Sequence, residues 1–199
     1  MSSTRDIGSF VAVVGPSGAG KDTLINAAHK ALEANPEFIF VRRIITRKPQ
    51  YEDNEDLSEQ DFLQQRQHGA FCLDWFAHGI YYALPKSCIE EAKAGKIVVA
   101  NISRDKIKLA AALFDNITVV EINAPAALLS QRLADRKREK ADDIKERLQR
   151  ATLTMQLPEK VDYQYIDNSH DVERAITRFI NILSTIEKTI VTKRSLRQQ

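Results

Sequence analysis

A glycine-rich loop between an apolar run and a helical pattern constrains this chain more than any other feature. Residues 15–23 read Gly-Pro-Ser-Gly-Ala-Gly-Lys-Asp-Thr and directly follow the wholly apolar run at residues 10–14. Such a run predicts a buried parallel strand, and residues 21–33 have the pattern of a helix. In a strand–loop–helix unit of this kind, loop N–H groups and the helix N-terminus converge on phosphate oxygens. The spacing therefore predicts a nucleoside-triphosphate site, lined by Gly15, Pro16, Ser17, Gly18, Ala19, Gly20, Lys21, Asp22 and Thr23.

Within this loop, Lys21 is expected to contact the β and γ phosphates. Asp22 stands where most such loops have a serine or threonine that binds Mg²⁺, and the apolar run at 97–100 ends in the neutral Asn101, where an aspartate commonly supports the metal. We hypothesise that the carboxylate has moved, so that Asp22 binds the Mg²⁺ that accompanies ATP. The alternative is that Thr23 or water binds the metal and Asp22 only stabilises the helix N-terminus.

Apolar runs of strand length alternate with helical patterns along the rest of the chain. Strands are expected at 38–45, 97–100 and 117–122, and helices from 58 and at 103–114, 125–136 and 172–190. This alternation predicts a three-layer α/β fold of the P-loop type with a mainly parallel sheet. We expect a single domain over residues 1–199 with its core at 9–190, an acceptor-binding insertion at 46–84, a lid at 134–150 and a frayed polar tail at 192–199.

Composition excludes several classes of protein. The 199 residues carry a formal net charge of +2, and no apolar run approaches the length of a membrane span. The N-terminus has no apolar signal region, and two cysteines are too few for a disulfide scaffold. The basic residues have no interleaved aromatics of the kind that nucleic-acid binding needs. We therefore expect a cytoplasmic enzyme with small-molecule partners, no nucleic acid and no membrane; a homodimer is left open.

Arginines are the candidate catalytic cations, because phosphoryl transfer spreads negative charge over the moving group. Arg47 follows the second expected strand, at the ligand-binding edge of the sheet. Arg136 and Arg147 lie within residues 132–150, a segment with eight basic residues. Their spacing predicts a lid that closes positive charge over the triphosphate and excludes water. The alternative for each arginine is a solvated surface charge.

Four segments together resemble the guanylate-kinase group of P-loop kinases. They are GPSGAGK at 15–21, ITRKP at 45–49, DWFAHGIYYAL at 74–84 and RLADRKREKADDIKERL at 132–148, and the resemblance covers residues 10–182. It implies that Arg136 and Arg147 surround the ATP phosphates. It also implies that Arg47 contacts the phosphate of the acceptor and that Tyr82 belongs to the same phosphate site.

The residues that read guanine in that group are replaced in this chain. Gln50 stands for a second arginine, Asp74 for the guanine-reading glutamate with a local spacing one residue shorter, and Asn101-Ile-Ser103-Arg104 for an Asp-x-Asp motif. These departures are similar to the ribose 1,5-bisphosphate phosphokinases of phosphonate breakdown, which share the GKD loop, the Asn-x-Ser-Arg segment and an extra arginine at Arg138. The expected acceptor contacts are Arg47, Asp74, His78, Tyr81, Tyr82, Asn101, Ser103, Arg104 and Arg138.

That resemblance implies ATP-dependent transfer to the 1-phosphate of ribose 1,5-bisphosphate, giving 5-phosphoribosyl 1-diphosphate and ADP. Such an acceptor is already ionised, which agrees with the lack of an evident general base. One alternative is guanylate kinase or another nucleoside-monophosphate kinase. Another is a non-catalytic guanylate-kinase-like interaction module, but such modules typically lose the loop lysine and lid arginines, whereas Lys21, Arg136 and Arg147 are present.

Overall fold

Five parallel strands form the central sheet of this protein. The computed structural model describes residues 8–46, 55–77, 79–135 and 157–197. The strand order is β2-β7-β1-β8-β9, and every neighbouring pair runs parallel. The strands are β1 (Ser9–Val14), β2 (Phe38–Phe40), β7 (Ile97–Asn101), β8 (Ile117–Asn123) and β9 (Asp162–Asp167).

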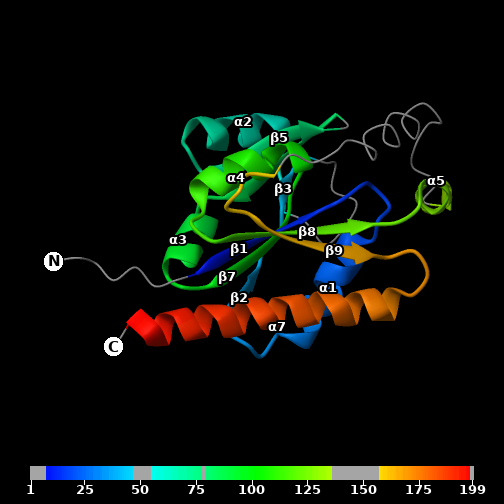
Figure 1. Cartoon of the computed structure of the whole chain (residues 1–199). Helices are drawn as coiled ribbons and strands as arrows, with labels where there is room; N and C mark the ends of the chain where they lie inside the picture. Colours follow the sequence, from blue (N-terminus) through cyan, green and yellow to red (C-terminus); the bar gives the residue numbers. More distant parts are fainter. Residues whose placement is uncertain (1–7, 47–54, 78, 136–156, 198–199) are drawn as a thin grey trace.

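Helices cover both faces of this sheet and form the three predicted layers (Figure 1). On one face, α1 (Lys21–Ala31) and α7 (Val172–Arg197) bury Leu24, Phe179 and Leu183 against alternate residues of β1. On the other face lie α3 (Ser87–Lys93), the short 3₁₀ helix η1 (Arg104–Lys106) and α4 (Ile107–Leu113). Helix α5 (Ala126–Asp135) follows β8. Because β1 is covered on both faces, all six of its residues are buried.

A second, four-stranded sheet packs against the α4 side of the central sheet. Its order is β4-β3-β6-β5, with β3 (Ile44–Ile45), β4 (Glu55–Asp56), β5 (Phe71–Ala77) and β6 (Ile80–Pro85). One face joins the core under α4 through Leu73, Trp75 and Leu84. The other face packs on α2 (Glu59–Gln67), where Phe62 is fully buried. This sheet therefore combines β4, β5 and β6 of the predicted acceptor-binding insertion with β3, which precedes the insertion.

Most predicted elements are confirmed, and three differences have physical causes. The single strand expected at 38–45 is wrong: β2 pairs with β7 in the central sheet, whereas β3 pairs with β6 in the second sheet. Strand β9 was not predicted, because an edge strand of sequence DYQYID lacks an apolar run. The frayed tail is also wrong, since α7 continues to Arg197. Arg194 ties its last turns to Glu37 at 2.8 Å and to the carbonyl of Gly95.

None of the helices in the described ranges combines the length and apolarity needed to cross a membrane.

Candidate active site

The loop after β1 adopts the predicted phosphate-cradle conformation at the carboxyl edge of the sheet. From β1 the chain passes to β2 and β7 on one side and then crosses to β8 and β9 on the other side, and ligands bind at such a switch point. Lys21 folds back over the loop, and its Nζ donates to the carbonyls of Gly15 (2.9 Å) and Pro16 (2.8 Å). Helix α1 starts directly after Gly20, so its N-terminal N–H groups face the same space.

Two side chains from distant parts of the chain hold this loop by hydrogen bonds to its backbone carbonyls. Asn168, which follows β9, is buried and donates from Nδ2 to the carbonyl of Ala19 at 2.8 Å. Arg132 of α5 donates to the carbonyls of Gly18 (3.4 Å) and Asn168 (3.0 Å). Gly20 leaves room for this contact, because a Cβ there would lie 2.4 Å from Asn168 Nδ2. The loop is therefore fixed before any ligand binds.

Asp22 and Asn101 lie in contact. This proximity is what the hypothesis needs, in which Asp22 supplies the metal-binding carboxylate that Asn101 lacks. Asn101 Nδ2 at the end of β7 donates to Asp22 Oδ1 at 2.8 Å, and an Arg43 NH2 group lies 3.4 Å from the same oxygen. Asn101 is buried, whereas the Asp22 side chain is 66% exposed at the mouth of the loop. The amide therefore orients a carboxylate that remains accessible to solvent.

This donor set fits a Mg²⁺ ion that is shared with ATP. In kinases the ion takes one or two protein carboxylates and completes its shell with phosphate oxygens and water. Asp22 could supply one hard oxygen ligand of this kind, on the residue directly after Lys21. Within residues 8–46, 55–77, 79–135 and 157–197, no group of three or more His, Cys, Asp or Glu could hold a metal by itself.

Tyr82, another predicted acceptor residue, is linked to this loop through Arg43. It pairs with Trp75 across the β5–β6 hairpin, and their rings stack with centroids 5.5 Å apart at 7°. The guanidinium of Arg43 lies 5.5 Å from the centroid of the Tyr82 ring. Arg43 therefore contacts both parts of the site. It contacts Tyr82 of the second sheet (β4-β3-β6-β5), called the acceptor sheet below, and Asp22 of the phosphate loop.

Tyr81 and Asp74 lie on the opposite face of the acceptor sheet from Tyr82. The ring of Tyr81 packs against Phe62 of α2 at 5.3 Å, and Asp74 Oδ1 forms an ion pair with Arg66 Nε of the same helix at 3.1 Å. Successive residues of a strand point to opposite faces, so the register of the hairpin determines this separation. The structure thus does not bring these two predicted contacts to the site with Tyr82.

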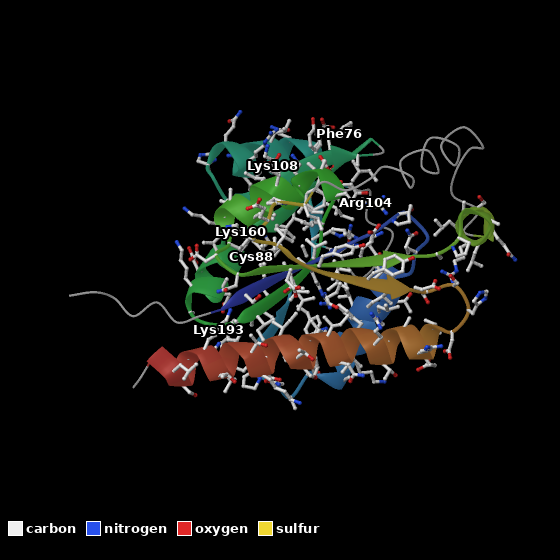
Figure 2. All side chains as sticks on the ribbon, in the orientation of Figure 1. Phe76, Cys88, Arg104, Lys108, Lys160 and Lys193 are labelled. Carbon is white, nitrogen blue, oxygen red and sulfur yellow. The ribbon has the colours of Figure 1, made fainter. Side chains whose placement is uncertain are left out.

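Figure 2 shows Arg104 toward the carboxyl ends of the central strands. It has a carboxylate partner there. Its NH2 group lies 3.0 Å from Glu121 Oε1 of β8, and both side chains are less than one fifth exposed. Tyr163 of β9 donates to the second oxygen of Glu121 at 2.7 Å. Partial burial and the Glu121 carboxylate raise the pKa of the Tyr163 phenol above its usual range, so the phenol remains a donor. Because Glu121 neutralises part of its charge, Arg104 adds less net positive charge to the site than the sequence suggests.

Ser103, the neighbouring predicted contact, directly precedes η1.

Five predicted site residues lie outside the described residues: Arg47, His78, Arg136, Arg138 and Arg147. Their roles, and the lid predicted at 134–150, stay predictions.

Arg43, Arg132 and Asn168 are site residues that the sequence analysis missed. Asn168 and Arg132 contact the loop across 149 and 114 positions of the chain, and no local pattern reports such contacts. For Arg43 a signal existed. Arg43 lies four residues before Arg47, so the sequence has two arginines near the carboxyl edge of the sheet, and only Arg47 was selected.

Comparisons with known proteins agree with this architecture. A family described as an AAA domain matches residues 10–158. A guanylate kinase from Anaplasma phagocytophilum superposes with a TM-score of 0.61 at 18% identity, over 90% of this chain and 86% of that chain. A sugar kinase from Janibacter has a TM-score of 0.51 at 17% identity over 92% and 98% of the two chains. The fold and the phosphate loop define a P-loop protein with a guanylate-kinase-like fold.

Sequence relatives narrow this class further. The ribose 1,5-bisphosphate phosphokinase PhnN of Brucella melitensis is 44% identical over 186 residues, which cover 92% of this chain and 96% of the relative. A bifunctional ribose 1,5-bisphosphokinase-thymidine phosphorylase of Cupriavidus pinatubonensis is 39% identical over 90% of this chain and 30% of the relative. The chain belongs to the ribose 1,5-bisphosphate phosphokinase family.

Proposed function

We propose that this protein transfers the γ-phosphoryl group of ATP to the 1-phosphate of ribose 1,5-bisphosphate, forming 5-phosphoribosyl 1-diphosphate and ADP. The family membership supports this acceptor, and the phosphate loop with Lys21 supports ATP as the donor. Guanylate kinase activity is the alternative, since the fold is shared with a guanylate kinase.

The position of Asp74 is the observation that favours ribose 1,5-bisphosphate over GMP as the acceptor. By resemblance, this residue stands for the glutamate that reads the guanine edge. Its carboxylate is instead paired with Arg66 of α2, on the face of the acceptor sheet that turns away from Tyr82. Asn101, the other candidate for a base contact, donates to Asp22. A purine that lost such polar partners would be recognised poorly, because discrimination depends on paired polar groups.

The chemistry of the proposed reaction requires orientation and positive charge rather than a proton acceptor. A phosphate monoester has its second pKa near 6, so an oxygen of the 1-phosphate carries negative charge at neutral pH. This oxygen would attack the γ-phosphorus, and the bond from that phosphorus to the β–γ bridging oxygen would break and release ADP. Lys21 would exchange the carbonyls of Gly15 and Pro16 for phosphate oxygens, and the N-terminus of α1 would face the phosphates.

Asp22 would hold the Mg²⁺ ion, with Asn101 orienting its carboxylate. When bound, the ion neutralises charge on the β and γ phosphates. Arg47, Arg136, Arg138 and Arg147 would supply further positive charge at the acceptor and the lid. Arg104 would face the acceptor while Glu121, which also accepts a hydrogen bond from Tyr163, holds its guanidinium.

The acceptor is tested by measuring ADP release with ribose 1,5-bisphosphate, with GMP and without an acceptor. We expect kcat/KM for ribose 1,5-bisphosphate to exceed that for GMP by at least about 10³-fold, as for sites whose buried polar groups reject an unmatched ligand. The Lys21→Met variant, purified in parallel, controls for contaminating kinases. Turnover with GMP alone would establish the nucleoside-monophosphate kinase instead, and no turnover with either acceptor would favour a non-catalytic module.

The role of Asp22 is tested by the Asp22→Asn variant, which retains an oxygen acceptor for Asn101 but lacks the charge. If the carboxylate binds the metal, the Mg²⁺ concentration for half-maximal turnover rises by at least about tenfold, the equivalent of about 1.4 kcal/mol. If Asp22 serves only the helix N-terminus, the variant loses about 0.3–1 kcal/mol of stability. Its Mg²⁺ dependence then stays at the wild-type value. Mg²⁺ titrations and thermal unfolding of both proteins separate these two results.

A further inference from the structure

We propose that Arg43 binds the phosphate group of the acceptor that receives the transferred phosphoryl group. This inference rests on the proposed function and names a recognition residue for it. Arg43 lies in the segment that leaves the carboxyl end of β2 and leads to β3 of the acceptor sheet. It therefore stands at the junction between the central sheet, which carries the ATP loop, and the sheet that contains Tyr82.

The two contacts of Arg43 place its guanidinium between the phosphate loop, which would bind ATP, and Tyr82, which would bind the acceptor substrate. One contact is Asp22 Oδ1 at 3.4 Å, on the residue directly after the phosphate-binding Lys21. The other is the ring of Tyr82, with its centroid 5.5 Å away, and Trp75 supports that ring by stacking. The aromatic face fixes the plane of the guanidinium and attracts its charge. A phosphate that binds here would lie beside Asp22, the residue that follows Lys21 in the phosphate loop.

Arg43 has hydrogen-bonding capacity left for such a ligand. A guanidinium has five N–H donors in a fixed fork that matches two phosphate oxygens. Among the residues that the structure describes, Asp22 is its one hydrogen-bond acceptor. The side chain is 21% exposed, so the charge is largely withdrawn from water but still reachable.

The ion pair with Asp22 can be replaced by a phosphate. The Asp22 side chain is 66% exposed, and water screens an ion pair with such a carboxylate. A phosphate carries up to two negative charges and presents several acceptor oxygens to the fork. Arg104 is less suited to this exchange, because its partner Glu121 is only 14% exposed and also accepts from Tyr163. Of these two arginines, Arg43 is thus the better suited to bind a phosphate of the acceptor.

The test compares Arg43→Met with Arg42→Met, because Arg42 is the adjacent arginine and is exposed. Calorimetry without nucleotide or Mg²⁺ measures the affinity for ribose 1,5-bisphosphate and for ribose 5-phosphate, which lacks the receiving phosphate. We expect Arg43→Met to weaken binding of the bisphosphate at least about twentyfold, as for hydrogen bonds to a charged group, and to change ribose 5-phosphate binding little. The KM for ATP should stay within about twofold, and Arg42→Met should resemble the wild type in every measurement.

Arg43→Lys is the second variant, since it keeps the charge without the fork and should fall between the wild type and Arg43→Met. Bisphosphate affinity within about threefold of wild type in Arg43→Met would overturn the proposal. Equal weakening of both sugar phosphates, or of ATP as well, would also overturn it. If the wild-type enzyme uses only GMP, the proposed function fails separately. The same variants are then assayed with GMP, and an unchanged affinity for its phosphate would overturn the role of Arg43.

Discussion

Replacing Lys21 by methionine is expected to lower kcat by about 10³-fold, near the upper range for removal of one preorganised group that stabilises transition-state charge. Lys21 is the cation at the phosphate loop, and its ammonium already lies against the carbonyls of Gly15 and Pro16. Methionine retains most of the side-chain length but cannot donate to phosphate. Steady-state ADP release with ribose 1,5-bisphosphate measures the loss.

The control for this variant is Lys30→Met, which removes an exposed lysine from the same helix. It should retain wild-type turnover. Thermal unfolding of Lys21→Met should show a loss of no more than about 2 kcal/mol, because the two lost hydrogen bonds are worth about 1 kcal/mol each and water can hydrogen-bond to the carbonyls instead. Turnover of Lys21→Met within tenfold of wild type would mean that Lys21 does not act on the transferred phosphoryl group.

The second large effect is expected for Gly15→Ala. Gly15 has a φ of 144°, and a Cβ there would lie 2.0 Å from the carbonyl oxygen of Ile122 in β8. Since that oxygen belongs to the backbone of a buried central strand, it cannot move away easily. Backbone strain and overpacking together should cost about 2–6 kcal/mol. The melting temperature should fall by about 5–20 °C and ATP binding should be lost.

Gly69→Ala separates the two causes of this effect. Gly69 also has a positive φ, of 68°, but a Cβ there would meet no atom within 4 Å. This variant should therefore lose only the cost of a left-handed residue, about 1–2 kcal/mol, and keep its affinity for ATP. Circular dichroism melts and nucleotide titrations of the two variants provide the comparison. Equal destabilisation in both would show that the contact with Ile122 does not limit position 15.

The phosphate loop could be predicted from sequence because its chemistry is local. Gly15 to Thr23 are consecutive, so one pattern specifies the strand end, the turn and the helix start together. The contact between Asp22 and Asn101 was also accessible to reasoning. Both residues follow buried parallel strands, and the carboxyl ends of such strands meet at one edge of a sheet.

The acceptor side was less predictable because it depends on pairing between strands. A change of one residue in register exchanges the two faces of a strand, so adjacent residues such as Tyr81 and Tyr82 receive opposite surroundings. Resemblance alone could not tell that Asp74 turns to Arg66 on the α2 side. Arg104 illustrates a second limit, since its charge was evident but its partner Glu121 lies 17 positions away on β8.

The amino-acid sequence by itself determined the alternating α/β architecture, the ATP-binding loop and the identity of its lysine, because short-range geometry and apolar periodicity dictate all three. Tertiary structure alone decided which polar groups share a site. It brought Arg43 to Asp22 and Tyr82, gave Arg104 a carboxylate partner and turned Asp74 away. The physical reason is that hydrogen bonds and ion pairs act over a few ångströms in space, and sheet pairing and register place distant residues within that range.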